Sequence, residues 1–354
     1  MSFLQSSIQK INPMRTAFKF IPLSSSWVAI HPKPKGVIQF IGGAFFGSLP
    51  TLFYRYFLSK LFADGYTIIA LPFRFSFQHW SIAIALLNEQ SILQREIPKE
   101  ARKLGYDDSI YADASNYFWV GHSLGCKYIA LLEFLSEGDW RDKLRQCVDS
   151  QEVEVVERVF DRINPGKTSI LNQPSLLIAP DISNTESAVP IRALARLLDW
   201  LGLGVTPKRK QTQCFIELSN LFNLTAMISF TQDTVAGSLT DSTKSPEIQA
   251  ESDILWFAKQ LQDRDLINKE IPGKHLEPVG IRVGNYIVDL NPLDKFIEFI
   301  SSRCLEQVAL QLLEKLERRE EGLELDAIQS VVKLTETLPK AEDNTLIPLP
   351  QTSG

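Results

Sequence analysis

One pentapeptide, GHSLG at residues 121–125, constrains the fold of this chain more than any other feature of its sequence. It stands between an apolar run of strand length, Tyr117–Val120, and a segment with helical spacing, Leu124–Leu135. A G-x-S-x-G motif between a strand and a helix is typical of a serine on a sharp, strained turn, where the helix N-terminus favours developing negative charge. The pattern therefore predicts that Ser123 is a catalytic nucleophile. The alternative is a tight turn in which the serine only caps the helix.

The rest of the chain alternates short apolar runs with segments of helical spacing. Continuous apolar strands separated by helices indicate a parallel sheet that is covered on both faces. We therefore predict an α/β protein with the α/β-hydrolase fold: a mostly parallel central sheet with helices on both faces, a helical cap insertion and extra C-terminal helices. The expected strands are Ser26–Ile30, Val37–Ile41, Tyr66–Leu71, Tyr117–Val120, Ser175–Ala179, Leu224–Phe230 and Ile267–Ile271. The expected helices are Leu49–Ala63, Gln78–Leu104, Leu124–Leu135 and Ser252–Gln262.

This pattern divides the chain into four regions. We expect an N-terminal extension at 1–20, the hydrolase domain at 21–300, C-terminal helices at 301–340 and a flexible polar tail at 341–354. Within the hydrolase domain, 139–170 and 181–222 fit the alternation poorly and are interpreted as cap segments. Pro190–Leu203 is amphipathic and is predicted to cover the carboxyl edge of the sheet, although it could also be an ordinary helix packed on the sheet. After Asp289 the spacing is helical again, with apolar residues at Leu305, Val308, Leu312 and Leu316.

A serine hydroxyl needs an adjacent base, and the base in turn needs an acid that orients it. In the predicted fold the order along the chain is serine, acid, histidine. His275 is the only one of the four histidines that follows Ser123, and it lies in a loop after the last expected strand. Asp233, after Leu224–Phe230, is the expected acid, and Asp181 is the alternative. The competing interpretations are a surface-loop histidine and an aspartate that only stabilises a turn or caps a helix.

The predicted reaction also needs two backbone N–H donors for the oxyanion. One is expected from Leu124, directly after the nucleophile, and the other from the loop after an early strand. The glycine-rich loop 42–47 fits that position, with Ala44 as the first candidate donor and Phe45 as the second. A phosphate-binding loop is the alternative, but the lysine and Ser/Thr of a Walker motif are absent from it.

Composition narrows the remaining classes of function. The net charge is −5 without basic clusters, so nucleic acid is not an expected partner. None of the four cysteines has C-x-x-C spacing, so we expect no metal and no cofactor, and scattered thiols indicate a reducing compartment. The N-terminus has no apolar secretory signal, and no apolar stretch is long enough to span a bilayer. A cytoplasmic protein is therefore expected.

Five segments together resemble an α/β-hydrolase-like family of cyanobacteria and plant plastids, catalogued as domain of unknown function 1350. They are Phe40–Arg55, Gly65–Phe73, Gly121–Lys127, Pro180–Glu186 and Gly273–Leu276. The resemblance covers roughly residues 20–300 and implies the hydrolase fold and a photosynthetic source, but it implies no substrate. The chain departs from better-known hydrolases at two places. Gly42-Gly43 replaces the usual His-Gly, and residues 72–75 (PFRF) replace Asp-x-x-Gly.

Large apolar residues near the expected site suggest a lipophilic substrate, although part of them could belong to the core. They are Phe45, Phe46, Phe73, Phe75, Phe77, Trp80, Leu197, Leu198, Trp200 and Leu201. The first hypothesis is therefore a serine hydrolase that cleaves a carboxylic ester or thioester. The second is a non-catalytic binding or assembly factor associated with photosynthetic membranes, whose C-terminal helices dock a protein partner. The third is a peripheral membrane contact through Pro190–Leu203.

Overall fold

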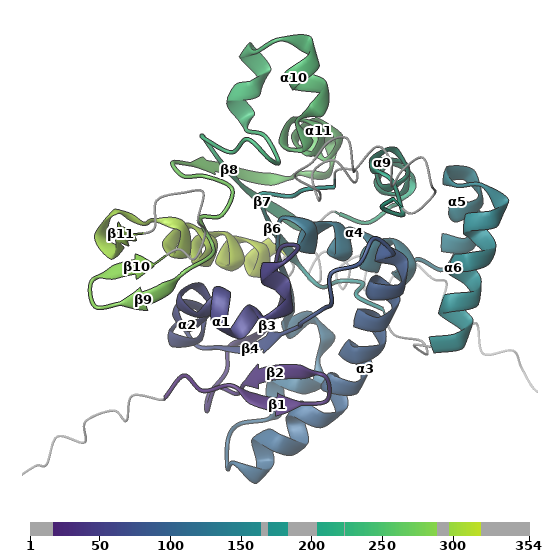
Figure 1. The fold of residues 1–354 in the computed structure, drawn as a ribbon. Coiled ribbons are helices and arrows are strands. Elements are labelled where there is room, and N and C mark those ends of the chain that lie inside the picture. The colour runs from purple at the N-terminus through teal and green to yellow at the C-terminus, as the bar shows by residue number, and fades with distance from the viewer. Residues whose placement is uncertain (1–16, 164–168, 183–203, 223, 289–296, 320–354) are drawn as a thin grey trace, which may run out of the picture.

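The computed structural model describes residues 17–163, 169–182, 204–222, 224–288 and 297–319 of the chain. Its centre is an eight-stranded sheet in the order β1-β2-β4-β3-β5-β6-β7-β8 (Figure 1). β2 pairs antiparallel with β1 and with β4, and the other pairings in this sheet are parallel. In order from β1 to β8, the strands are Ile21–Leu23, Ser26–Ala29, Gly36–Ile41, Tyr66–Ala70, Tyr117–His122, Ser175–Ile178, Thr225–Phe230 and Ile267–Ile271. The predicted mostly parallel sheet is confirmed.

Burial explains why the sequence of these strands is so uniformly apolar. Every residue of β3, β4, β5, β6 and β7 is buried, because helices cover both faces of the sheet (Figure 1). Strands covered on both sides cannot alternate apolar and polar residues. β8 lies at the edge, and its Asn268 and Lys269 are exposed, which suits a strand with one unpaired side.

The helices follow the strands as the spacing predicts. α1 (Pro50–Phe53) and α2 (Arg55–Ala63) follow β3, α3 (His79–Lys103) follows β4, α4 (Leu124–Ser136) follows β5, and α11 (Asp253–Gln260) precedes β8. The single helix expected at Leu49–Ala63 is instead two, which meet at Tyr54. α4 is buried along nearly its whole length, since it contacts the sheet as well as α3 and α9 (Arg209–Leu218). No described helix combines the length and the apolar character that crossing a membrane requires.

The two predicted cap segments are described only in part. In the first, α5 (Trp140–Cys147) and α6 (Ser150–Ile163) form a pair in which α6 packs on α3 and α5 packs on α4 and α9. In the second, α9 is described, while Pro190–Leu203 lies outside the described residues. Of the C-terminal helices expected at 301–340, only the part up to residue 319 is described, and the tail at 341–354 lies outside the described residues. The division of the chain into these regions stays a prediction.

The chain after β8 contains short strands that the sequence analysis did not predict. Three short strands, β9 (Ile281–Val283), β10 (Tyr286–Val288) and β11 (Ile297–Phe299), form a second, antiparallel sheet in the order β11-β10-β9. The interpretation of all residues after Asp289 as helical is therefore wrong at β11, because three residues are too few to reveal a strand period. Residues 305–319 are helical, and they bury Leu305, Leu312 and Leu316.

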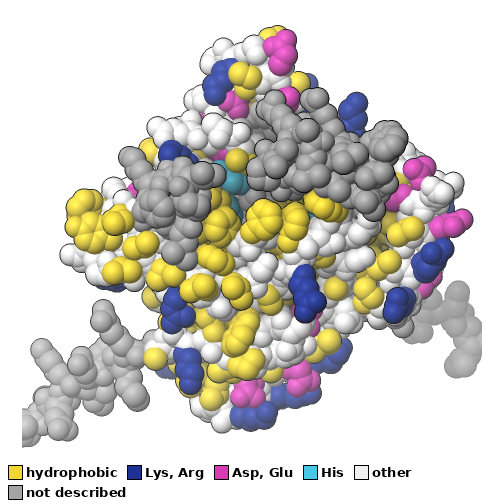
Figure 2. Space-filling model, in the orientation of Figure 1, with side chains coloured by type: hydrophobic (Ala, Val, Ile, Leu, Met, Phe, Trp, Pro, Cys, Tyr) yellow, Lys and Arg dark blue, Asp and Glu magenta, His cyan; other side chains and the backbone are white. Residues whose placement is uncertain are grey.

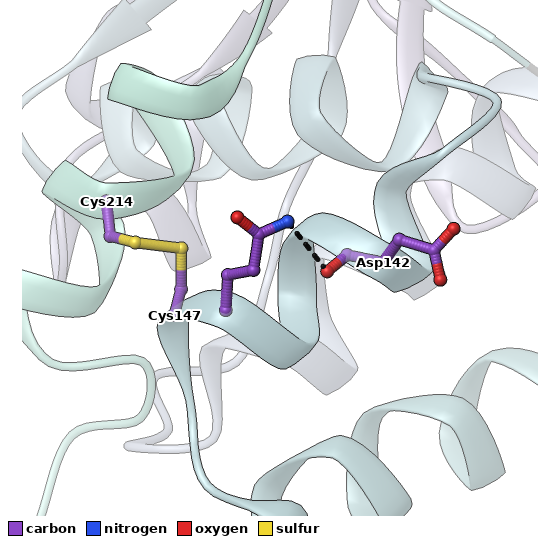
Figure 3. The surroundings of a disulfide bond; sticks show 4 residues. Asp142, Cys147 and Cys214 are labelled. Carbon is purple, nitrogen blue, oxygen red and sulfur yellow. Dashed lines mark hydrogen bonds between the residues drawn. A yellow bond between two sulfur atoms is a disulfide. The ribbon is translucent and has the colours of Figure 1, made fainter.

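Two of the cysteines form a disulfide. Cys147, at the end of α5, is bonded to Cys214 in α9, and their Cα atoms are 5.7 Å apart (Figure 3). The interpretation of the cysteines as scattered thiols is therefore wrong for this pair, and the inference of a reducing compartment loses its basis. The two residues are 67 positions apart, so only the packing of α5 on α9 brings them together. Cys126 and Cys304 are free thiols.

Candidate active site

Ser123 lies on the turn between β5 and α4, with φ 54° and ψ −123°. A positive φ is rare for a residue with a side chain and costs free energy that the surroundings must offset. A Cβ on Gly121 would lie 2.7 Å from Cδ1 of Ile129, and one on Gly125 would lie 2.2 Å from the carbonyl oxygen of Ile41. Gly121 therefore lets β5 and α4 close on each other, and Gly125 lets α4 approach the end of β3. The turn leaves the Ser123 side chain at the carboxyl edge of the sheet.

The three residues that the sequence proposes for a triad are brought together. Oγ of Ser123 is 2.8 Å from Nε2 of His275, and Nδ1 of His275 is 2.8 Å from Oδ2 of Asp233. Their positions come from three different loops, after β5, β7 and β8. The backbone N–H of Gln232 donates to the carbonyl oxygen of Gly273, which joins the last two loops to each other. The arrangement is thus fixed by main-chain contacts as well as by the side chains.

Asp233 is anchored on both of its carboxylate oxygens. Oδ1 accepts hydrogen bonds from the backbone N–H groups of Val235 at 2.7 Å and Ala236 at 3.0 Å, while Oδ2 faces His275. Oδ1 therefore stabilises the turn, as the competing interpretation expects, while Oδ2 faces the imidazole, as the acid hypothesis expects. The side chain is fully buried, and the hydrogen bonds on its two oxygens hold the carboxylate in this orientation.

Asp181, the alternative acid, follows β6 and lies elsewhere around the same site. Its backbone N–H donates to the carbonyl oxygen of Ser123 at 3.3 Å. Burial alone would lower the pKa of His275, but the hydrogen bond and charge of Asp233, with the charge of Asp181, outweigh burial and raise it. Asp233 therefore occupies the position at Nδ1, and Asp181 contributes negative charge near the imidazole.

The loop after β3 runs directly against the nucleophile. A Cβ on Gly43 would lie 3.1 Å from Cβ of Ser123, so a side chain here would force a small shift of the loop or of Ser123. Within the described residues, the backbone N–H groups of Ala44 and Phe45 donate to no protein acceptor. Leu124 provides the first backbone N–H of α4, which has no acceptor one turn earlier in the helix. These three donors keep their predicted role as candidates for the oxyanion.

Sequence reasoning gave no role to Tyr54 and His122, which are both fully buried beside this loop. Oη of Tyr54 lies 2.7 Å from the backbone nitrogen of Gly43 and 2.8 Å from Nδ1 of His122. Nε2 of His122 lies 2.8 Å from the carbonyl oxygen of His275. The position of His122 inside GHSLG was visible in the sequence, but its partners are 68 and 153 residues away.

The apolar residues near the site divide into exposed and core groups. Phe45 is 58% exposed and stacks on Phe75, with ring centroids 4.6 Å apart, and Phe75 contacts Phe77. Phe73 and Trp80 are buried and belong to the core. The expected residues Leu197, Leu198, Trp200 and Leu201 lie outside the described residues. Figure 2 shows histidine atoms at the surface beside a group of hydrophobic side chains.

Among the described residues, no group of three or more His, Cys, Asp or Glu side chains is arranged to hold a metal ion. The contacts from Ser123 through His275 to Asp233 bring a hydroxyl, an imidazole and a carboxylate together in that order. Such a chain can pass a proton from the hydroxyl to the ring and stabilise the charge that forms on it.

A strained serine turn at the carboxyl edge of an eight-stranded sheet, with β2 antiparallel to the others, defines an α/β-hydrolase-fold protein. The chain belongs to the family described as "protein of unknown function (DUF1350)", which matches residues 19–318. The resemblance noted in the sequence is thereby confirmed, and the match includes the serine turn and the loops of Asp233 and His275.

Solved structures with partial similarity include three esterases. The carboxylesterase Cest-2923 from Lactobacillus plantarum WCFS1 is 10% identical, with a TM-score of 0.49 over 84% of this chain and 96% of that one. Esterase B from Lactobacillus rhamnosis is 10% identical, with a TM-score of 0.48 over 84% and 83%. Thermogutta terrifontis esterase 2, phosphoramylated by tabun, is 14% identical, with a TM-score of 0.42 over 82% and 89%. No curated protein sequence matches this chain significantly.

Proposed function

We propose that the protein is a serine hydrolase that cleaves a carboxylic ester or thioester of a lipophilic acyl substrate through an acyl-enzyme. The observation that carries the proposal is the pair of 2.8 Å contacts that run from Ser123 through His275 to Asp233. A carboxylate at Nδ1 keeps the proton of a neutral imidazole on that nitrogen. Nε2 is then free to accept the proton of the serine hydroxyl.

In the proposed reaction, Oγ of Ser123 attacks the acyl carbon while Nε2 of His275 takes the hydroxyl proton. The negative charge that develops on the substrate oxygen is stabilised by the N–H of Leu124 and by that of Ala44 or Phe45. The imidazolium then protonates the leaving alcohol or thiol, which departs and leaves the acyl group on Ser123. A water molecule, deprotonated by His275, releases the acid and restores the serine.

The exposed aromatic group supports a lipophilic acyl chain as the substrate. Phe45, which directly follows the candidate donor Ala44, presents its ring to solvent and stacks on Phe75, which in turn contacts Phe77. An acyl chain that leaves the site along this side would bury apolar surface of both partners, worth about 25 cal/mol for each Å² removed from water. A short acetyl group has too little apolar surface to gain much from this burial.

A fluorophosphonate probe tests the proposal directly, because it reacts with an activated serine and not with an ordinary hydroxyl. The probe should label wild-type protein at Ser123, as located by mass spectrometry, and should not label Ser123→Ala. Ser242→Ala, at an exposed serine, is the matched control and should be labelled like wild type. If folded wild-type protein is not labelled, the hydrolase is refuted, and a binding or assembly role would fit the fold better.

A series of acyl esters of increasing length tests the substrate class separately. Hydrolysis should improve from acetyl to longer chains, and Phe45→Ala should lower the preference for long chains while leaving acetyl hydrolysis nearly unchanged. A wild-type preference for acetyl esters would contradict the proposal of a lipophilic substrate, but it would not contradict the proposed triad.

A further inference from the structure

Tyr54 and His122 form a chain of buried contacts beside the candidate site. Oη of Tyr54 lies 2.7 Å from the backbone nitrogen of Gly43 and 2.8 Å from Nδ1 of His122, and Nε2 of His122 lies 2.8 Å from the carbonyl oxygen of His275. Both side chains have no solvent exposure. Each polar atom along the chain therefore has to be satisfied by its neighbour, since water does not reach it.

Only one assignment of protons satisfies every contact. The carbonyl oxygen of His275 can only accept, so Nε2 of His122 carries the proton. Burial and the neighbouring charge of His275 lower the pKa of His122 to about 3, which keeps the ring neutral and leaves Nδ1 with a lone pair. Nδ1 then accepts from the hydroxyl of Tyr54, whose oxygen accepts from the N–H of Gly43. Burial raises the pKa of Tyr54, so the phenol keeps the proton that this chain needs.

The hydrogen bonds of Tyr54 and His122 connect three segments whose relative positions the proposed reaction depends on. Gly43 directly precedes the candidate oxyanion donor Ala44 in the loop after β3. His122 directly precedes Ser123 at the end of β5. The third contact is to the main chain of His275 itself, so it positions the residue whose side chain faces Ser123. A Cβ on Gly43 would also lie 3.2 Å from Nδ1 of His122, which shows how closely the first two segments pack.

We propose that Tyr54 and His122 are positioning residues for the hydrolase reaction, and that they fix the oxyanion loop and the His275 main chain relative to Ser123. This inference rests on the proposed function. Neither residue exchanges a proton with the substrate, because both nitrogens of His122 and the hydroxyl of Tyr54 are already engaged. Their effect is on distances around the reacting atoms, where displacements near 1 Å can cost about 100-fold in rate.

Tyr54→Phe is the variant that tests the inference, because it removes one oxygen and keeps the ring. It leaves the N–H of Gly43 and Nδ1 of His122 without a partner, so the loop is expected to shift. Tyr128→Phe is the matched control: Tyr128 is also a buried tyrosine, and its hydroxyl has no hydrogen-bond partner within the described residues. His122→Gln, which can still donate to the His275 carbonyl oxygen, is the second variant.

Turnover per active site is the decisive measurement, with sites counted by fluorophosphonate titration. Tyr54→Phe and His122→Gln should lower kcat per titrated site about 10- to 100-fold, while KM changes by less than about twofold and Tyr128→Phe matches wild type. A purely structural role would lower the number of titrated sites and leave kcat per site unchanged. Nitrogen NMR of the His122 ring should show the neutral Nε2–H form from pH 8 to pH 5 in wild type.

Two different failures are distinguishable. If wild-type protein is not labelled at Ser123, the proposed function is refuted and the positioning role with it. If wild type is labelled and turns over, but Tyr54→Phe has the same kcat per titrated site, the positioning role alone is refuted. A His122 ring that is charged at neutral pH, or that carries its proton on Nδ1, would also overturn it.

Discussion

Replacing Asp233 by asparagine should nearly abolish hydrolysis, and the structure gives the reason. Oδ1 of Asp233 is held by two backbone N–H groups, of Val235 and Ala236. An asparagine can satisfy them only by placing its carbonyl oxygen there, which turns its NH₂ group toward Nδ1 of His275. Nδ1 must then be the acceptor and Nε2 must carry the proton. The ring would present a donor to Ser123, which is the wrong tautomer for a base.

The size of the expected loss in rate follows from the loss of His275 as a base, and not from the loss of one hydrogen bond. An equivalent exchange of acid for amide in a serine protease triad lowers kcat by about 10⁴-fold, which corresponds to about 5.5 kcal/mol of activation free energy. Since the two N–H groups fix the orientation of the amide here, we expect a loss of about 10³- to 10⁴-fold in kcat/KM. The variant should fold like wild type, because asparagine has the shape of aspartate and keeps the hydrogen bonds from Val235 and Ala236.

The pH profile provides a second, independent readout. Burial lowers the pKa of His275, and the hydrogen bond and charge of Asp233 are the main contributions that raise it. In wild type, kcat/KM should therefore rise with pH through an inflection above 6.5, where the imidazolium loses its proton. Without the carboxylate, burial dominates, so the inflection of the residual activity should move to lower pH.

Initial rates on a chromogenic ester, measured from pH 5 to 9 and normalised to folded protein, test both expectations. Asp181→Asn is the matched control, because it removes a nearby negative charge without changing the tautomer of His275. It should lower kcat/KM by less than about tenfold. The reasoning is refuted if Asp233→Asn retains activity within tenfold of wild type, or if Asp181→Asn is the more damaging of the two.

Two further predictions concern stability. Burial raises the pKa of Glu133 from 4.5 to about 8, because the protonated acid is favoured in the folded protein. The free energy of unfolding that this protonation contributes is fully present below pH 4.5 and is lost as the pH rises through about 8. Glu133→Gln, which resembles the protonated acid, should therefore match wild type in urea unfolding near pH 4.5. It should be more stable by on the order of 4 kcal/mol at pH 9, and an unchanged difference between the two pH values would contradict this. The Cys147–Cys214 disulfide closes a loop with a separation of 67 residues. The double variant Cys147→Ala/Cys214→Ala should therefore lose up to about 4 kcal/mol of unfolding free energy, whereas Cys304→Ala, at a free thiol, should lose much less.

The main elements of the fold could be predicted because each is encoded locally. β5 and α4 are a continuous apolar run and a helical repeat on either side of one motif, and the other inner strands have the same uniform burial. β11 could not be predicted in this way, because three residues contain too little of any period. The disulfide could not be predicted for a different reason: its two cysteines meet only after α5 and α9 have packed.

The candidate site shows the same division between local and long-range information. Ser123, Asp233 and His275 could be proposed because the fold fixes their order and because only one histidine follows the serine. Which acid faces the ring is a matter of loop geometry: the main-chain contact between Gln232 and Gly273 joins the Asp233 loop to the His275 loop. Asp181 and Asp233 therefore could not be separated by their spacing alone.

The departure at the candidate oxyanion loop, residues 42–47, has a physical explanation in Tyr54. Better-known hydrolases have histidine before the glycine here, whereas this chain has Gly42. A Cβ on Gly42 would lie 2.6 Å from the ring of Tyr54, so no larger residue fits while that tyrosine is present. The same ring supplies the hydroxyl that accepts from the N–H of Gly43 and contacts His122. The tyrosine thus excludes a side chain at position 42 and anchors the loop from outside it. A histidine at position 42 would displace the loop from Tyr54, and the positions of the groups around Ser123 would change as a result.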